Sequence, residues 1–432
     1  MTDLLQLNLQ VIAQRWPAIA GQLAPLSTDS LNATLVEGLE QTISINGLQL
    51  SSRHGRIREA ALLCSQVPRD TESLHLYGTG MGDVAIYLLE NHPLQSLYVH
   101  LMNLKVFKLL LTYTNQSEWL SDPRVQLIAT PDSDYPKQPN IAIPPELALC
   151  DEDYSVVRDM LVYELNREHV NHNRSQQIDR YKHRLASNRG NLQADADVSV
   201  MTADYHCQQA LVIAAGPSLE EHYQALLQIS KRPRSQRPLL IAVDTAVKGL
   251  HSKGIQADVI VTVDELITAQ IINLENCEGC ALVYMAKTDP ELIAHWPGPR
   301  FNAHSDLPRD DKLAADIPKT RLFLNGSVVH PAIHLALLLG AQDITLIGAD
   351  FGYVGKKAHA FWQPNIIGGG FQDTGHRVLD GHGGQLPTAL NLRAYLRALE
   401  HFIRKYPHIK FYRASLNGAD IKGTTFRALN HD

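Results

Sequence analysis

The chain has 432 residues, of which 44% are hydrophobic and 19% charged, and its formal net charge is -6. This balance gives no long-range attraction to nucleic acid or to acidic membrane surfaces, so we expect neither as a partner. No stretch contains 18 uninterrupted apolar residues, which predicts that no helix spans a membrane. The five cysteines, of which only Cys277 and Cys280 form a CxxC pair, predict a cytoplasmic protein without a metal site.

The first 150 residues predict a small α/β domain behind an N-terminal region. Residues 1–55 alternate helical and strand patterns, with a hairpin signal at Asn46-Gly47. Residues 56–150 alternate strands and helices, which is typical of a parallel sheet. We therefore expect a Rossmann-like domain over 56–150.

The sequence GTGMGD follows the first strand of this domain and has the glycine spacing of a phosphate-binding turn. In a dinucleotide-binding domain, the next strand ends with an acid that holds the ribose. Here that strand reads SLYVHLMN and places His100, Met102 and Asn103 at its end. We therefore expect a structural turn that binds no cofactor.

The remaining chain predicts a connecting segment and a second α/β domain. Residues 151–208 are polar and helical, and residues 209–432 alternate apolar strands with helices, as in a doubly wound parallel sheet. The predicted strands are ALVIAAG, PLLIAVDT, DVIVTVDE, ALVYMA, RLFLNGS, ITLIGADF and IKFYRAS. The chain is thus predicted to contain two Rossmann-like, doubly wound domains joined by a helical linker.

Polar residues follow five of the otherwise apolar strands of the second domain. They are Gly216, Pro217 and Ser218, then Asp244 and Thr245, then Thr262, Asp264 and Glu265, then Asn325, Gly326 and Ser327, and finally Asp350. Ligands of open parallel sheets gather at the carboxyl ends of the strands. One polar strand end would only indicate a helix cap, but five on one edge predict a binding site.

Two of these strand ends have the features of a phosphate site. In GPSLEE the glycine permits close approach to the backbone, and proline at the first helical turn loses no hydrogen bond. The amides behind Ser218 would then face an anion at the start of the helix. The sequence NGSVVHP repeats the arrangement, so a phosphate-bearing ligand is expected, although each junction also fits an ordinary capped helix.

A long segment after Asp350 has few apolar runs that could form a strand or helix. Loops of this length are usually functional or disordered. It contains Tyr353, His359 and His382 among aromatic residues and glycines, which suits sugar binding and acid–base chemistry. The alternative for each histidine is an ordinary solvated side chain.

The order of these motifs resembles a known family. VIAAGPSLEE, GIQADVIVTVDE and GSVVHPAIHLALLLGAQDITLIGADFGY resemble the central domain of the motility-associated factors, the bacterial Maf flagellin glycosyltransferases. That domain is also similar to archaeal 6-hydroxymethylpterin diphosphokinase. The same order resembles Campylobacter-type bacterial sialyltransferases, which bind a CMP-sugar. The resemblance covers roughly residues 209–425, and the N-terminal half resembles the Rossmann-like domain of Maf proteins.

The resemblance implies a CMP-linked nonulosonic acid as donor, a protein such as flagellin as acceptor, and no required cofactor. The residues that it places around the nucleotide and donor sugar are Gly216, Pro217, Ser218, Asp244, Thr245, Asp264, Asn325, Gly326, Ser327 and Asp350.

The resemblance also implies three catalytic residues. Tyr353 and His359 would donate hydrogen bonds to the leaving phosphate, where charge develops. His382 would deprotonate the acceptor hydroxyl, since imidazole has a pKa near neutrality. Transfer would then proceed with inversion and without a covalent intermediate.

Two alternatives stay open. Asp258, Asp264 and Glu265 partly fit a pyrophosphokinase that binds Mg-ATP, because carboxylates and phosphates together hold magnesium. The domain could also be a non-catalytic module that binds a nucleotide.

Overall fold

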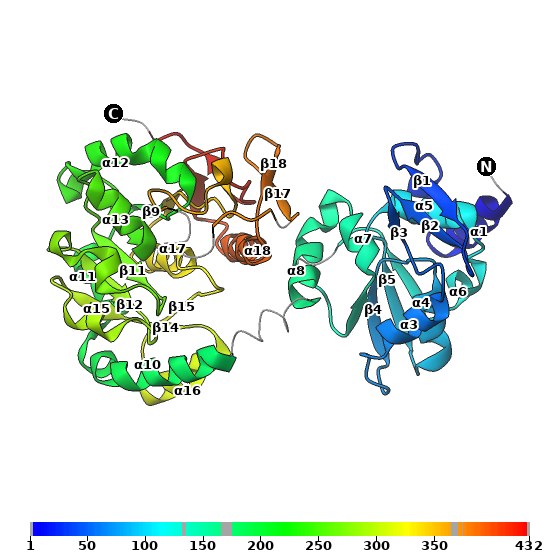
Figure 1. The fold of residues 1–432 in the computed structure, drawn as a ribbon, viewed down its shortest axis with the longest axis horizontal. Helices are drawn as coiled ribbons and strands as arrows, with labels where there is room; N and C mark the ends of the chain where they lie inside the picture. The colour runs from blue at the N-terminus through cyan, green and yellow to red at the C-terminus, as the bar shows by residue number, and fades with distance from the viewer. Residues whose placement is uncertain (1–2, 132–134, 166–174, 364–369, 374, 430–432) are drawn as a thin grey trace. The chain divides into compact units, whose positions relative to one another are not determined.

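The computed structural model describes residues 3–131, 135–165, 175–363, 370–373 and 375–429 (Figure 1). Contacts divide the chain into two units, Met1–Leu165 and Asn166–Asp432. Each unit contains a parallel sheet, which confirms the predicted α/β fold class. No helix within the described ranges is long and apolar enough to cross a membrane.

The first unit is built around a four-stranded parallel sheet with the order β6-β5-β4-β7. Its strands are β4 (Ser73–Tyr77), β5 (Ser96–His100), β6 (Val125–Ile128) and β7 (Asn140–Ala142). Its helices are α1 (Asp3–Arg15), α2 (Pro17–Leu23), α3 (Arg56–Cys64), α4 (Asp83–Asn91), α5 (Leu104–Tyr113), α6 (Ser117–Ser121), α7 (Pro144–Ala148) and α8 (Ser155–Leu165).

The hairpin signal at Asn46-Gly47 lies in a separate antiparallel sheet of the first unit. This sheet consists of β1 (Ala33–Val36), β2 (Thr42–Ile45) and β3 (Leu48–Gln49). Asn46 and Gly47 join β2 to β3, and both have positive φ. Two-residue hairpin turns require this conformation, which explains why the sequence predicted the turn.

The second unit is built around a nine-stranded sheet with the order β20-β19-β16-β9-β10-β11-β12-β13-β8, in which every neighbouring pair is parallel. The strands are β8 (Ala196–Asp197), β9 (Gln209–Ile213), β10 (Leu239–Val243), β11 (Val259–Thr262), β12 (Ala281–Tyr284), β13 (Arg300–Asn302), β16 (Asp343–Ile347), β19 (Lys410–Arg413) and β20 (Thr425–Phe426).

The central strands of this sheet are apolar along their whole length. Every residue of β10, β11 and β12 is buried. Continuous apolar strands are typical of a parallel sheet with both faces covered. In Figure 1 helix α13 (Asp244–Ser252) and helix α17 (Val329–Leu338) lie on opposite sides of these strands.

The other helices of the second unit connect its strands around the sheet. They are α10 (Ser175–Ala194), α11 (Thr202–Tyr205), α12 (Tyr223–Ser230), α14 (Ala269–Ile272), α15 (Pro290–Ala294), α16 (Asp311–Asp316) and α18 (Leu390–Arg404).

The segment expected to connect two domains divides between the units. Helix α8 belongs to the first unit, whereas α10 packs into the second, where Asn188 donates hydrogen bonds to the carbonyls of Ala286 (2.9 Å) and Thr288 (2.7 Å). Strand β8 then forms the edge of the nine-stranded sheet. Residues 175–208 are therefore built into the second unit.

One strand prediction was wrong in its placement. The run RLFLNGS was expected to join the main sheet, but its strand β15 (Arg321–Leu322) pairs with β14 (His304–Ser305) in a separate two-stranded sheet. The reason is that β14 continues the chain just beyond β13 and offers β15 an alternative partner. The turn after β15 therefore does not follow a strand of the main sheet.

Candidate functional site

The candidate site lies where the strand order of the second unit's main sheet reverses. Strand β9 pairs with β10 on one side and with β16 on the other. The strands that follow β9 in the chain are therefore added first on one side of it and later on the other. In open α/β sheets, ligands bind outside the carboxyl ends of the strands at such a switch point. Here the two carboxyl ends lead into Gly216-Pro217-Ser218 and into Asp350.

These two strand ends bind each other. The backbone N–H of Ser218 donates to Oδ2 of Asp350 (2.8 Å), and the Ser218 hydroxyl donates to Oδ1 (2.5 Å). Asp350 is 4% exposed and Ser218 1%. Burial raises the pKa of Asp350 to about 6, although the hydrogen bonds from Ser218 act in the opposite direction. The carboxylate thus occupies the place at the start of the helix where the sequence placed a ligand phosphate.

The glycines around Asp350 make room for this carboxylate. A side chain at Gly216 would bring its Cβ to 2.6 Å from Oδ2 of Asp350, and one at Gly418 would lie 2.6 Å from Oδ1. The close approach that glycine permits at this junction is therefore to an internal group. Pro217 is also buried, and η3 (Pro217–His222) begins there without a side-chain cap.

A second buried carboxylate lies at the ends of β10 and β11. Asp244 begins α13, accepts the Thr262 hydroxyl at 2.7 Å and accepts the Thr245 amide at 2.7 Å. Burial raises the pKa of Asp244 to about 6, and the negative charge of Asp264 adds to the rise. Asp264 is only half-buried, so it is the more accessible carboxylate of the two.

The segment from Lys357 to Trp362 crosses the carboxyl ends of β9 and β10. The Ala360 amide donates to the Ala215 carbonyl (2.8 Å), and the Trp362 indole donates to the Thr245 carbonyl (2.8 Å). Glu220 holds the same segment by accepting from Lys357 Nζ (2.8 Å) and from the Phe361 amide (3.0 Å). This segment therefore covers the switch point as a docked lid.

The sequence analysis did not single out Glu220 or Trp362 for this role. Glu220 belongs to the GPSLEE motif and Trp362 to the glycine-rich segment, so both stretches were noticed. The sequence signal for this contact was the opposite charge of Glu220 and Lys357, but these residues are 137 positions apart. Sequence separation of this size leaves such pairs undetermined.

Of the three expected catalytic residues, Tyr353 precedes the lid and His359 lies within it. Tyr353 is half-buried, its amide donates to the Pro387 carbonyl (2.8 Å), and its ring packs edge-on against Phe371. Burial raises the pKa of Tyr353 and lowers the pKa of His359. Both side chains therefore hold their protons as neutral hydrogen-bond donors near pH 7.

The third, His382, lies at the exposed tip of a hairpin. Strands β17 (Arg377–Leu379) and β18 (Gln385–Pro387) form this hairpin, and Asp380 fixes its turn by accepting the amides of His382 (2.9 Å) and Gly384 (2.8 Å). The backbone of Asp380 also forms an isolated antiparallel β-bridge with Ala419. The Ala419 amide in turn donates to the Asp350 carbonyl (2.8 Å). The hairpin thus lies on the β16 side of the switch point.

The Asn325-Gly326-Ser327 turn precedes α17 and is fastened by a buried histidine. Nδ1 of His330 accepts the Asn325 amide (3.1 Å), while Nε2 contacts the Tyr395 carbonyl (3.0 Å) and must carry the proton. Burial lowers the pKa of His330 to about 4, which keeps this tautomer neutral. His330 therefore positions the turn, a role that sequence reasoning missed.

The glycine turn GTGMGD of the first unit, like the turn Gly216–Ser218, donates its backbone amides to a buried carboxylate. The amides of Thr79 and Gly80 both donate to Oε1 of Glu146 at 2.6 Å. Glu146 is 1% exposed, and burial raises its pKa. Asn103, where a ribose-binding acid was sought, caps α5 through the amide of Lys105 (2.9 Å). An internal carboxylate thus uses the amides that would face a phosphate.

Of the comparisons with known proteins, one matches part of the second unit, one finds no match, and one covers nearly the whole chain. Residues 182–356 match the family model of 6-hydroxymethylpterin diphosphokinase MptE-like proteins. No curated protein matches the chain. Among solved structures, a Maf glycosyltransferase from Magnetospirillum magneticum AMB-1 matches with 15% identity and a TM-score of 0.47, over 99% of this chain and 74% of that one. The similarity of the central domain to 6-hydroxymethylpterin diphosphokinases is thus confirmed over residues 182–356.

Proposed function

We propose that the second unit is a glycosyltransferase that uses a nucleotide-sugar at the carboxyl edge of its sheet. The observation that carries the proposal is the lid of residues 357–362, which docks across the switch point, follows the neutral donor Tyr353 and contains the neutral donor His359. A lid at this position would exclude water from a reactive donor.

The proposed donor is a CMP-linked nonulosonic acid, and the proposed acceptor is a protein such as flagellin. The sequence resemblance to the motility-associated factors and bacterial sialyltransferases supports this choice. Asp264 could accept hydrogen bonds from donor hydroxyls, and the buried Asp244 lies at the end of the neighbouring strand. Lys248, whose ammonium lies 5.2 Å from the Trp362 ring centroid, supplies a positive charge for the phosphate.

The proposed reaction is a single inverting displacement. The acceptor hydroxyl oxygen attacks the anomeric carbon as the bond from that carbon to the phosphate oxygen breaks, and CMP leaves. The hydroxyl proton passes to His382, and hydrogen bonds from Tyr353 and His359 stabilise the charge on the departing phosphate. Because buried His359 is neutral, it donates an N–H without adding a charge.

A second candidate is a diphosphokinase-like enzyme, favoured by the family model that matches residues 182–356. This alternative was based on Asp258, Asp264 and Glu265, but Asp258 precedes β11 and binds Arg237 (2.6 and 2.7 Å), so only Asp264 and Glu265 would be placed to hold Mg-ATP. Among the described residues, no group of three or more His, Cys, Asp or Glu side chains could bind a metal ion. The magnesium would therefore be held jointly with the ATP phosphates.

Release of CMP from CMP-N-acetylneuraminic acid tests the main proposal. Because His382 is exposed at a hairpin tip, His382→Ala should leave the fold intact and reduce turnover by at least about 100-fold, the usual contribution of a general base. Unchanged turnover in this variant would reject His382 as the base. Metal-dependent binding of ATP, with no effect of the CMP-sugar, would favour the kinase, and CMP binding without turnover would favour a non-catalytic module.

A further inference from the structure

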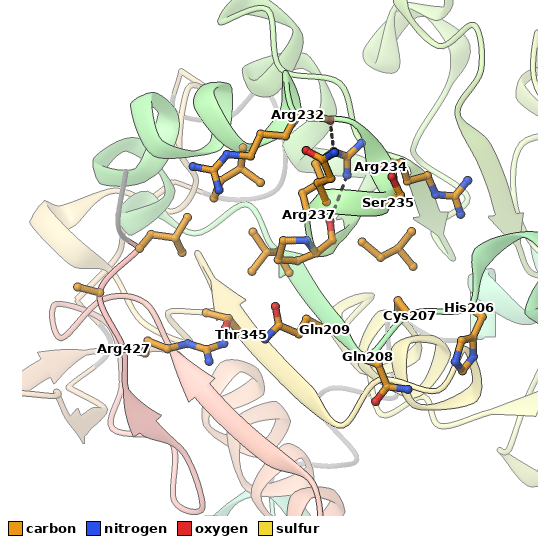
Figure 2. Close-up of a pocket in the computed structure, with 17 residues that line it drawn as sticks. His206, Cys207, Gln208, Gln209, Arg232, Arg234, Ser235, Arg237, Thr345 and Arg427 are labelled. Atoms are coloured by element: carbon orange, nitrogen blue, oxygen red, sulfur yellow. Dashed lines mark hydrogen bonds between the residues drawn. The ribbon is translucent and has the colours of Figure 1, made fainter. Parts of the chain in front are cut away.

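A pocket of about 900 Å³ opens at the opposite edge of the same sheet, where the strands begin (Figure 2). Gln209 and Leu239 are the first residues of β9 and β10, and Thr345 is the middle residue of β16. The loop between α12 and β10 and the segment after β20 complete its wall. The pocket is separated from the switch point by the length of these strands, so the proposed transfer reaction does not use it.

Among the described residues, the wall of this pocket carries arginines and no carboxylate side chain. Arg232, Arg234, Arg237 and Arg427 approach it from two segments of the chain (Figure 2). Arg237 is fixed by two hydrogen bonds to Asp258 (2.6 and 2.7 Å), and Arg427 by two to Asp343 (2.9 and 2.6 Å). These two pairs hold guanidinium groups in place beside the pocket.

Arg234 supplies a positive charge that these pairs do not neutralise. Its guanidinium donates to the Asp204 carbonyl (2.7 Å) and lies 4.2 Å over the Tyr205 ring. Within the described residues no carboxylate pairs with it, and the residue is exposed. A guanidinium held on an aromatic face with donors to spare is suited to a phosphate.

We propose that this pocket binds a small organic phosphate. Arg234 would contact the phosphate, and the amides of Gln208 and Gln209 would meet hydroxyl or carbonyl groups. Leu211 and Leu239 line the remaining wall and suit a less polar portion of the ligand. The volume corresponds to that of common small-molecule sites, which bury most of a ligand.

The position makes this a second site rather than part of the first. Strand β9 starts at the pocket with Gln209 and leads to the Gly216 turn, and β16 leads from Thr345 to Asp350. The two strands therefore join the pocket directly to the Ser218–Asp350 hydrogen bonds.

Calorimetric titration of the full chain with inorganic pyrophosphate and with ribose 5-phosphate tests the proposal. We expect saturable binding that weakens with salt. Arg234→Glu and Gln209→Glu each place a negative charge at the pocket and should weaken binding at least about tenfold, as expected for losing one charge-assisted hydrogen bond. Both positions are exposed, so folding should persist, and circular dichroism verifies it.

Two control variants locate the binding. Arg189→Glu reverses a half-exposed arginine outside the pocket and should bind as wild type. Asp264→Asn alters the carboxyl edge and should also leave binding unchanged. The proposal is overturned if the wild type shows no saturable binding, if either pocket variant binds as wild type, or if Asp264→Asn changes the affinity instead.

Discussion

Replacing Asp350 by asparagine tests the internal-carboxylate arrangement at the switch point. Asparagine has nearly the same shape, and its amide can accept the Ser218 N–H through oxygen and donate to the Ser218 hydroxyl through nitrogen. The variant therefore keeps two hydrogen bonds and removes an ionisable group that is 4% exposed. We expect it to fold and to be at least as stable as wild type above pH 7.

The magnitude follows from the pKa of Asp350. Burial raises it from 3.8 to about 6 in the folded chain. The folded state therefore binds more protons than the unfolded state between these values, so stability falls as pH rises through this window. The cost at pH 7 is about 3 kcal/mol, since one pKa unit corresponds to about 1.36 kcal/mol. Asp350→Asn does not lose this stability, because asparagine does not ionise.

Urea unfolding of both proteins, followed by intrinsic fluorescence, measures the difference. Relative to wild type, the variant should gain about 2 kcal/mol between about pH 4.5 and pH 7.5, the part of the linkage that falls in this range. A difference in unfolding free energy between the variant and wild type that does not change with pH would refute the reasoning. So would a large destabilisation of the variant at pH 8, which would show that Asp350 is needed as an anion.

Three further predictions concern the other fixed contacts. Glu146→Gln should keep both amide contacts and the stability of the first unit, whereas Glu146→Ala should cost about 1–3 kcal/mol for each buried amide left unsatisfied, measured by urea unfolding. Glu220→Ala removes both contacts of Glu220 and should loosen the lid, so amide exchange in 357–362 should accelerate, and Lys357→Met should have a smaller effect because the Phe361 amide stays bound. Gly216→Ala should lower the melting temperature, since its Cβ would press on Asp350 at a cost of about 1–3 kcal/mol; an unchanged melting temperature would contradict the packing described.

The sequence predicted the architecture of the second unit because its central strands are wholly buried. Strands such as β10 read as continuous apolar runs, and that pattern with intervening helices is specific to parallel sheets. The Asn46-Gly47 hairpin was equally readable, since few residues adopt positive φ at both turn positions. Local conformational preferences were thus sufficient for these elements.

Contacts between residues far apart in the chain could not be predicted from the sequence. Ser218 and Asp350 are 132 positions apart, and both were chosen as ligand-binding residues because nothing local indicates that they bind each other. The same holds for Glu146 and the GTGMGD turn. Strand β15 was assigned to the wrong sheet because its pairing with β14 depends on the path of the chain after β13. Each of these features is decided by tertiary packing.

Hydrogen–deuterium exchange with and without CMP tests most directly whether the nucleotide site lies at the carboxyl edge of the second sheet. The account predicts slower exchange in residues 353–362 and in the start of α13, where the lid meets Thr245. Protection confined to residues 232–237 and 427–429 would place the nucleotide at the opposite edge. Protection of the GTGMGD turn would place it in the first unit, and either result would contradict the account.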